Sequence, residues 1–304
     1  MKLSKKFIAT LESVFEEDGK QFIKDLSKLI EEASSRWILK DMKPVSNLSY
    51  NFVAFATSLF LEKENPVVLK IGVPREELIS EMQALKLYNG NGACKLIASD
   101  EEKGFLLLES LQPGRMLSEL DDDDERTQIA MDVMQKIHRP TEADSLSNNK
   151  FIKLSDWFNG LKNIRPHYGG TGPFPKEILE RVESVLPDLF KDDFFLLHGD
   201  FHHFNILSSE RDWVIIDPKG VVGPAGYEIG PFMLNPWGMF HDEKQFKTLT
   251  KRRVDIIRER TGWERELIIH WALSHAVLSA WWNFESNIKD EHSLTCAKVF
   301  SEFK

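Results

Sequence analysis

The stretch "FFLLHGDFHHFNILSSERDWVIIDPKG", residues 194–220, places ionisable side chains between short apolar runs. The segments "NILS" and "WVIID" have strand composition, and the polar turn "SERD" between them predicts a β-hairpin. Such a hairpin brings Asn205, at the start of one strand, close to Asp217, at the end of the other. Asp200 lies on the loop just before the hairpin. The stretch therefore predicts three oxygen-bearing side chains in one place.

These side chains are suited to phosphoryl transfer. Amide and carboxylate oxygens are the hard ligands that Mg²⁺ prefers when nucleotide phosphates complete its coordination, so Asn205 and Asp217 are candidate metal ligands. Asp200 is placed to accept a proton from a substrate hydroxyl and to orient that hydroxyl for in-line attack. A nucleoside triphosphate is the expected co-substrate.

Three histidines in the same stretch allow a different interpretation. His198, His202 and His203 could hold a transition metal in a metal-dependent hydrolase. Adjacent histidines on a loop point apart, however, and no further ligand pattern accompanies them. We therefore favour phosphoryl transfer, whereas a bound transition metal in the purified protein would indicate the hydrolase.

Composition limits the class of protein. With 304 residues and 42% hydrophobic content, the chain can form one large or two fused lobes. Cys94 and Cys296 lie far apart in sequence, without CxxC spacing, which argues against a disulfide framework or a zinc site. The first 20 residues have helical spacing rather than the apolar core of a signal peptide, so we expect a cytoplasmic protein.

Hydropathy and charge argue against membranes and nucleic acid. Residues 267–284 contain no Asp, Glu, Lys or Arg, but their histidines and asparagine would be costly at membrane depth, so a buried core helix is expected. Residues 1–110 hold 15 Lys or Arg and 17 Asp or Glu, so most of the formal charge of −9 falls on the remainder. An acidic second half does not suit nucleic acid, but it suits a cationic small substrate.

Periodicity predicts an α+β architecture. Residues 1–34 have a helical pattern that is broken near Gly19. Strand-like segments then surround the helical segment "PREELISEMQALKLY", which predicts a small antiparallel sheet carrying one helix. Beyond residue 111 the pattern is mainly helical, and the acidic run 121–124 is expected to be a solvated helix start rather than a metal site. The expected units are a helical extension (1–34), a nucleotide-binding lobe (35–110) and a catalytic and substrate-binding lobe (111–304).

The motifs resemble a known family. "HGDFHHFNIL" followed by "VIIDPKG" is similar to the catalytic loop and metal-binding segment of the aminoglycoside phosphotransferases, relatives of the protein kinases. "DPKGVVGPAGYEIGPFMLNPW" most resembles the branch of streptomycin 6-phosphotransferases and aminoglycoside/hydroxyurea antibiotic resistance kinases. The similarity extends from roughly residue 45 to residue 285. It implies a protein-kinase-like, two-lobed fold, with a small antiparallel-sheet N-lobe carrying one helix and a larger, mainly helical C-lobe.

The resemblance implies a phosphate clamp in the N-lobe. A kinase-like lobe needs a strand lysine for the nucleotide phosphates and a helix glutamate to hold that lysine. Lys70 of "VVLKIG" matches the lysine, and Glu81 matches the glutamate, with Glu77 one turn earlier as a reserve candidate. The alternative is an ordinary exposed ion pair of little energetic consequence.

The resemblance also implies where the nucleotide binds. "LLLESLQPG" is similar to the hinge between the lobes, where backbone groups near Glu109 and Leu111 would bind the purine edge. The turn in "KPVSNLSYNF" departs from protein kinases because it lacks a GxGxxG run. Ser46, Asn47 and Ser49 would have to present hydrogen-bond donors to the phosphates instead.

Other residues of the C-lobe have implied supporting roles. The resemblance makes His198 a residue that holds the catalytic loop, and Glu228 occupies a position where relatives often have an aspartate that braces this loop. Lys219 either neutralises charge on the transferred phosphoryl group or pairs with Glu228.

Substrate recognition is expected in the C-lobe, because the acceptor hydroxyl must approach Asp200 from that side. Acidic and aromatic side chains favour a cationic acceptor through charge pairing and cation–π contact. The candidates are Asn235, Trp237, Trp281, Trp282 and Glu285. Adjacent tryptophans on a helix cannot both face one pocket, so at least one of that pair is expected to pack in the core.

The predicted reaction is transfer of the γ-phosphoryl group of ATP, with Mg²⁺, to a hydroxyl of a small molecule. The resemblance implies an aminoglycoside acceptor of the streptomycin type and a role in antibiotic resistance. A kinase for another amine-bearing alcohol or sugar metabolite, such as choline, is one alternative. A nucleotide-binding module that has lost catalysis is another, and the joint presence of Asp200, Asn205, Asp217 and Lys70 argues against it.

Overall fold

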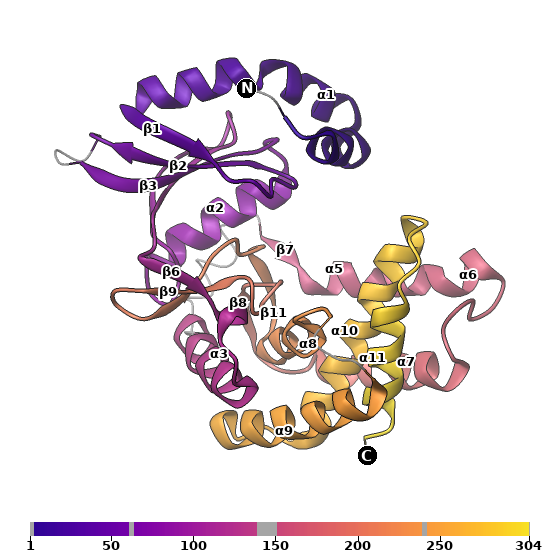
Figure 1. The fold of residues 1–304 in the computed structure, drawn as a ribbon. Coiled ribbons are helices and arrows are strands. Elements are labelled where there is room, and N and C mark those ends of the chain that lie inside the picture. Colours follow the sequence, from indigo (N-terminus) through magenta and orange to yellow (C-terminus); the bar gives the residue numbers. More distant parts are fainter. Residues whose placement is uncertain (1–2, 61–63, 139–150, 239–241, 304) are drawn as a thin grey trace.

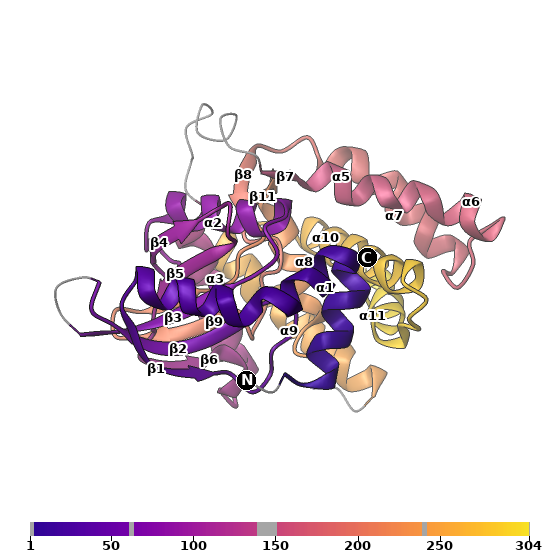
Figure 2. The ribbon, with the colours of Figure 1, turned by 90° about the horizontal axis from the view of Figure 1, so that it is seen from above.

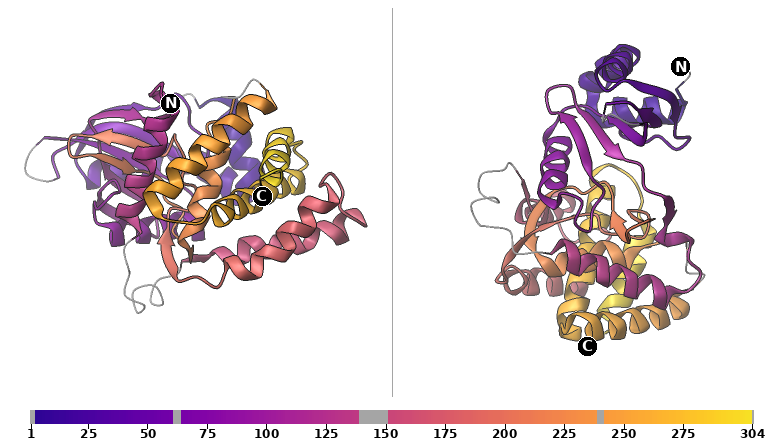
Figure 3. Two further views of the ribbon diagram at one scale, coloured as in Figure 1. Left: turned by 90° about the horizontal axis from the view of Figure 1, so that it is seen from below. Right: turned by 90° about the vertical axis from the view of Figure 1, so that its left-hand side faces the viewer.

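The computed structural model describes residues 3–60, 64–138, 151–238 and 242–303 of the protein. Two lobes are stacked one above the other (Figures 1 and 3). The N-lobe contains a five-stranded sheet, and the C-lobe is mainly helical. This arrangement confirms the predicted α+β, two-lobed architecture.

The N-lobe is built on an antiparallel sheet with the strand order β1-β2-β3-β5-β4. Alternation along β3 places Val67, Leu69 and Ile71 in one buried cluster with α1, and Lys70 on the opposite face. Helix α2 packs with the opposite face, in the cluster that also contains Leu106 and Leu108. The elements of this lobe are α1 (Lys5–Arg36), β1 (Leu39–Pro44), β2 (Phe52–Ser58), β3 (Asn65–Ile71), α2 (Glu76–Tyr88), β4 (Leu96–Asp100) and β5 (Phe105–Glu109).

Helix α1 is part of the N-lobe core. It begins at Lys5, after the N-cap Ser4, whose side chain accepts a hydrogen bond from the Phe7 N–H (3.1 Å). The helix is kinked at Glu16, slightly before the predicted break near Gly19. Its buried face contacts the sheet across the molecule's upper surface (Figure 2). That face includes Phe7, Leu11, Phe22, Leu26 and Ala33. The residues expected as an extension therefore stabilise the sheet directly.

The C-lobe combines two small sheets with a group of helices. The sheets have the orders β10-β9-β6 and β7-β11-β8. Helices α5, α6 and α7 extend to one side of the lobe (Figures 2 and 3). The elements are β6 (Pro113–Met116), η1 (Leu117–Glu119), α3 (Asp123–Ile137), β7 (Ile152–Lys153), α5 (Leu154–Asn159), η2 (Gly160–Asn163), α6 (Ile164–Tyr168), α7 (Lys176–Leu189), β8 (Phe194–Leu197), β9 (Ile206–Ser209), β10 (Trp213–Ile215), β11 (Val221–Pro224), η3 (Ala225–Glu228), α8 (Ile229–Leu234), α9 (Glu243–Thr261), α10 (Arg265–Glu285) and α11 (Glu291–Ser301).

Helix α10 is the predicted core helix. Most of its residues, including Trp271 and Trp281, are buried in the main hydrophobic cluster. No helix of the described residues has the length and apolar character needed to cross a membrane. Cys94 and Cys296 are both buried free thiols, as expected.

The acidic run at the start of α3 is only partly solvated. Asp122 caps the helix and accepts a hydrogen bond from the Asp124 N–H (2.8 Å), which confirms the predicted helix start. Asp123 instead pairs with the buried Arg253 of α9 through two hydrogen bonds (2.7 and 2.8 Å). The expectation of solvation is wrong for Asp123, because α9 presents an arginine that would otherwise be a buried unpaired charge.

The lobes meet where α2 contacts the segment 196–220 of the C-lobe. The chain leaves the N-lobe sheet at the end of β5, and β6 then pairs with β9 of the C-lobe. The Ser80 hydroxyl donates to the Gly220 carbonyl oxygen (2.6 Å), and the Tyr88 hydroxyl donates to the Leu196 carbonyl oxygen (3.2 Å). The lobe boundary that we expect after residue 110 stays a proposal. The passage of the chain from β5 to β6 supports it.

Gly220 provides a test of this close packing. Its φ is +64°, and a Cβ there would lie 2.5 Å from the Ser80 carbonyl oxygen. Gly169 has a similar φ of +65° with no atom within 4 Å of its Cβ position. We expect Gly169→Ala to cost roughly 1–2 kcal/mol through backbone strain, and Gly220→Ala to cost roughly 1–3 kcal/mol more through the clash. Thermal unfolding of the two variants measures the difference, and equal midpoints would contradict the close packing at this junction.

Candidate active site

Lys70 lies between the two lobes and contacts two carboxylates. Its ammonium donates to both carboxylate oxygens of Glu81 (2.7 and 2.8 Å) and lies 3.2 Å from Asp217 Oδ1. Lys70 is 3% exposed and Glu81 6% exposed. Glu77, the reserve candidate, is exposed and instead lies 3.8 Å from the ammonium of Lys219. The structure therefore pairs Lys70 with Glu81 and links both to the C-lobe through Asp217.

The charges of this group depend on one another. Burial lowers the pKa of Lys70, but the charges of Asp217 and Glu81 outweigh burial and raise this pKa above its ordinary value. Burial raises the pKa of Glu81 to about 7, because the loss of water outweighs the attraction of Lys70. Burial alone would raise the pKa of Asp217, but the positive charge of Lys70 outweighs burial and lowers this pKa. Lys70 and Asp217 are therefore both ionised at neutral pH.

The loop before Asp200 is fixed by the neutral ring of His198. The Asp200 N–H donates to Nδ1 of this ring (3.1 Å), so the proton is on Nε2, which donates to the Ile216 carbonyl oxygen (2.9 Å). Burial lowers the pKa of His198 and keeps the ring neutral. His198 thus connects the loop to the end of strand β10, in the supporting position that the resemblance implied.

Glu228 braces the same loop through its carboxylate. Its carboxylate is fully buried and accepts hydrogen bonds from the backbone N–H groups of His198 and Gly199 (3.2 Å for Gly199). The glutamate therefore reaches the loop, in the bracing position that the resemblance implied. Lys219 does not pair with Glu228; its described ionic contact is with Glu77.

Asp200 presents its carboxylate to a cavity between the lobes. The side chain is 42% exposed, and Oδ1 lies 3.4 Å from His202 Nε2. Burial alone would raise the pKa of Asp200, but the neighbouring His202 and the positive charge of Lys219 outweigh burial and lower this pKa. An ionised carboxylate at this place can accept a proton or a hydrogen bond from a bound hydroxyl.

The β9–β10 hairpin brings Asn205 and Asp217 together. Ile206 pairs with Ile215, and the Ile216 N–H donates to the Asn205 carbonyl oxygen (2.9 Å). Asn205 Nδ2 donates to the Asp200 carbonyl oxygen (3.0 Å), which leaves the amide oxygen of Asn205 as an available acceptor.

This donor set fits Mg²⁺ better than a transition metal. Among the described residues, no group of three or more His, Cys, Asp or Glu side chains could hold a metal ion. One amide and one ionised carboxylate are a typical protein contribution to Mg²⁺ when phosphates and water complete its coordination. His203 stacks on Phe232 (4.4 Å between ring centroids) and lies apart from this set, so the geometry does not support the histidine-based hydrolase.

Two cavities meet at Lys70 and Asp217. We call the first, of about 430 Å³, the inner cavity; its lining includes Asn47, Val53, Val68, Glu109, Leu111 and Leu207. We call the second, of about 760 Å³, the outer cavity; its lining includes Phe15, Arg75, Glu76, Asp200, Asn205 and Lys219. Ser49 and Asn51 line both, whereas Ser46 is exposed on the same turn and is absent from the lining of either.

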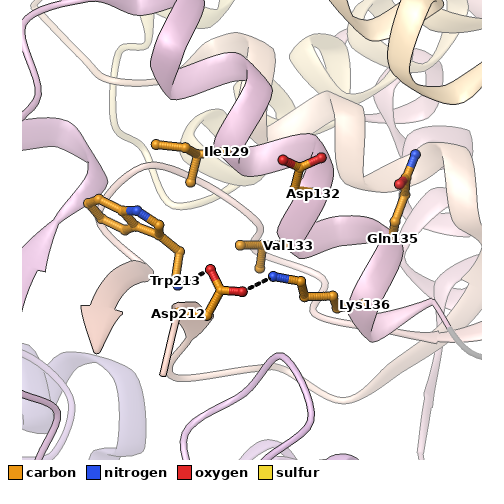
Figure 4. Close-up of a pocket in the computed structure, with 7 residues that line it drawn as sticks. All are labelled: Ile129, Asp132, Val133, Gln135, Lys136, Asp212 and Trp213. Carbon is orange, nitrogen blue, oxygen red and sulfur yellow. Dashed lines mark hydrogen bonds and ion pairs between the residues drawn. The ribbon is translucent and has the colours of Figure 1, made fainter. Parts of the chain in front are cut away.

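A further hollow lies on the outside of the C-lobe, between α3 and the β9–β10 turn. Figure 4 shows Lys136 and Asp212 paired across it, with Trp213 and Ile129 at one side. None of the predicted site residues lines this hollow. We therefore do not assign it to the phosphoryl-transfer site.

The predicted substrate residues do not line the outer cavity. Asn235 donates to the Pro231 carbonyl oxygen (2.9 Å), Trp237 is 54% exposed beside His292, and Glu285 is exposed at the end of α10. Trp281 is buried, as expected for one member of the pair. The four other roles therefore stay predictions.

Trp282 approaches the loop of Asp200 through an intermediate ring. It contacts Trp157 edge-to-face (5.4 Å), and Trp157 lies 3.3 Å from the Cβ position of Gly199. The sequence pattern did not single out Trp157, nor Phe15 and Arg75 of the outer cavity. Their positions follow from packing between distant elements, which the local sequence does not encode.

The fold and these contacts define a class of protein, the two-lobed proteins with a protein-kinase-like fold. Among solved structures, similar chains include a choline/ethanolamine kinase family protein from Mesorhizobium loti, with TM-score 0.59, 12% identity, and coverage of 90% of this chain and 93% of that chain. A ternary complex of aminoglycoside phosphotransferase APH(4)-Ia with ADP and hygromycin B is also similar, with TM-score 0.58, 11% identity, and coverage of 90% and 98%.

The sequence comparisons identify the family. The chain belongs to the aminoglycoside/hydroxyurea antibiotic resistance kinases, which it matches over residues 38–287. A streptomycin 6-kinase from Streptomyces griseus is 24% identical over 277 residues, covering 90% of this chain and 87% of that protein. The predicted family and the protein-kinase-like fold are therefore confirmed.

The raised pKa of Glu81 predicts how the stability of the protein depends on pH. Because its pKa in the folded protein is raised to about 7, the folded state keeps a proton that the unfolded state has already lost, so stability falls as the pH rises through this window. Glu81→Gln removes the titration. Between about pH 5 and about pH 8, we expect the unfolding temperature of E81Q to rise relative to the wild type, corresponding to at most about 3 kcal/mol.

The matched control is Glu77→Gln, one turn earlier and exposed, which leaves Glu81 in place and should therefore keep the contribution of Glu81 to the pH dependence. Thermal unfolding across this pH range measures both variants. A constant difference between E81Q and the wild type would mean that Glu81 does not titrate in the window.

Proposed function

We propose that the protein transfers the γ-phosphoryl group of ATP, with Mg²⁺, to a hydroxyl of a small cationic molecule, and that this acceptor is an aminoglycoside of the streptomycin type. The observation that supports this most directly is that Asp200, Asn205, Asp217 and Lys70 all line the outer cavity. Membership of a kinase family and the 24% identity to a streptomycin 6-kinase support the acceptor class.

The nucleotide base is proposed to occupy the inner cavity. Apolar side chains from both lobes, including Val53, Val68 and Leu207, provide opposite walls for a flat ring. Among the described residues, no protein group accepts a hydrogen bond from the Leu111 N–H. That N–H and a carbonyl near Glu109 are suited to the purine edge.

The phosphates are proposed to lie where the two cavities meet. The Lys70 ammonium would bind the α- and β-phosphates, held in place by Glu81. Asn47 and Ser49 line the cavity from the β1–β2 turn, and Ser46 lies on the same turn. Asn205 and Asp217 would hold Mg²⁺, which supplies positive charge next to the phosphate oxygens.

Asp200 is proposed to act on the acceptor. Its carboxylate is ionised at neutral pH and half-exposed, so it can orient the attacking hydroxyl and accept its proton. Glu228 and the His198 ring accept hydrogen bonds from backbone N–H groups of the loop, and these bonds keep the Asp200 carboxylate in place. Asn235, Trp237, Trp282 and Glu285 stay candidates for contacts with parts of the acceptor distant from the reacting hydroxyl.

Two alternatives to this function are a different amine-bearing acceptor and a nucleotide-binding module without catalysis. Similarity to a choline/ethanolamine kinase family protein keeps a simpler amine-bearing alcohol as the second acceptor class, although at 12% identity it concerns the fold alone. A nucleotide-binding module that has lost catalysis is disfavoured, because the carboxylates of Glu81 and Asp217 both contact the Lys70 ammonium at hydrogen-bonding distances. The acidic outer cavity suits a cation rather than nucleic acid, and we place the reaction in the cytoplasm.

A panel of acceptors tests the proposal. Streptomycin, hygromycin B and choline are incubated with labelled ATP, Mg²⁺ and the wild-type protein, and phosphorylated product is quantified. We expect turnover of streptomycin but not of choline. In Asp200→Asn the turnover should fall by on the order of 10²–10⁴, because the proton acceptor is lost, while ATP binding is retained.

Asp193→Asn, an exposed aspartate just before strand β8, is the matched control and should retain wild-type turnover. Turnover of choline alone would replace the proposed acceptor class. Unchanged streptomycin turnover in D200N would contradict the proposed role of Asp200.

A further inference from the structure

The first half of α1 ends in a sharp corner beside the outer cavity. Glu16, at this corner, has φ +51° and ψ −122°, which a residue with a side chain rarely adopts. Just beyond it, a Cβ on Gly19 would lie only 2.1 Å from the Leu11 carbonyl oxygen, so the two halves of α1 approach backbone to backbone. The corner is therefore a specific structure and not a frayed helix end.

Arg75 attaches this corner to the start of α2. Its guanidinium donates to Asp18 Oδ2 (2.7 and 3.2 Å) and to the Phe15 carbonyl oxygen (3.1 Å). It also lies over the Phe15 ring, 5.3 Å from the centroid. Because α2 carries Glu81 as well, one helix positions both the corner and the partner of Lys70.

The corner lines the outer cavity and is absent from the inner one. Val14 and Phe15 belong to the same lining as Asp200 and Lys219, whereas α1 contributes nothing to the inner cavity. In Figures 1 and 2 the first half of α1 projects beyond the sheet on the side of α10 and α11. The family match begins at residue 38, after α1 has ended.

The charges beside the corner favour a cation. Lys70 is held by Glu81 and Asp217, and Arg75 is held by Asp18. The third lining cation, Lys219, lies 3.8 Å from the carboxylate of Glu77. Among the described residues, Glu76 and Asp200 line the cavity with no Lys or Arg within ion-pair distance of their carboxylates. The wall around the corner therefore presents negative charge next to the apolar side chains of Val14 and Phe15.

We propose that the corner of α1, residues 14–18, forms one wall of the acceptor site, with Val14 and Phe15 contacting the carbon skeleton of the acceptor and Glu76 facing its cationic group. This inference rests on the proposed function for its substrate class. It assigns acceptor selectivity to an N-lobe element, in addition to the C-lobe residues considered above.

Two substitutions of opposite charge at Val14 test the proposal. Val14 is 46% exposed, so both substitutions leave the core intact. With streptomycin as the probe, Val14→Lys should raise the KM for streptomycin on the order of three-fold by charge repulsion, and V14E should lower or retain it. Both effects should shrink in about 0.5 M NaCl, because salt screens exposed charges. The KM for ATP should stay unchanged in both variants.

Phe15→Ala tests the apolar contact, with Phe60→Ala as a matched control on the same lobe. Phe60 is 45% exposed and is absent from the lining of both cavities. We expect F15A to raise the KM for streptomycin on the order of five-fold with little change in the KM for ATP, and F60A to change neither.

The outcomes separate this inference from the proposed function. Streptomycin turnover by the wild type with an unchanged streptomycin KM in V14K and F15A would overturn the inference alone. A lower ATP KM in V14K would also overturn it, because the corner would then face the nucleotide. Absence of streptomycin turnover in the wild type would overturn the proposed acceptor and this inference together.

Discussion

The structure depends on one buried ammonium group between two carboxylates. Lys70 comes from the N-lobe sheet, Glu81 from α2 and Asp217 from the C-lobe hairpin, so a single set of contacts joins three elements. Removing one partner of a buried ion pair typically costs about 3–5 kcal/mol, because the remaining charge is left without water. The hydrogen bond from Ser80 to Gly220 holds α2 against the same segment, so the relative position of the lobes and the proposed phosphate site are fixed together.

The elements that bear the proposed chemistry could be predicted because each has a local pattern. Alternation in "VVLKIG" places Lys70 on the face opposite Leu69 and Ile71, which is the orientation that the structure shows. The turn "SERD" fixes the register of the β9–β10 hairpin, which determines that Asn205 and Asp217 lie at the same end. These features need only strand periodicity and turn geometry, which short segments of sequence encode.

The remaining parts depend on contacts between distant segments. The kink at Glu16 and the approach of Gly19 to Leu11 follow from packing of α1 on the sheet, and no local pattern places Phe15 in the outer cavity. The pairing of Asp123 with Arg253 likewise joins residues of α3 and α9, so an acidic run was mistaken for a wholly solvated one. No local pattern shows which side chains contact the acceptor; Trp237 and Glu285 are exposed and do not line the outer cavity, so their roles stay predictions.

The central claim is that nucleotide phosphates and a divalent cation meet at Lys70, Asn205 and Asp217. A crystal structure of the full chain with a non-hydrolysable ATP analogue and Mn²⁺ tests it most directly, because Mn²⁺ is located by its anomalous scattering. The account predicts an anomalous peak within ligand distance of Asn205 and Asp217, phosphates against the Lys70 ammonium, and the base between Val53 and Leu207. A cation bound at His202 or His203, or phosphates distant from Lys70, would contradict it.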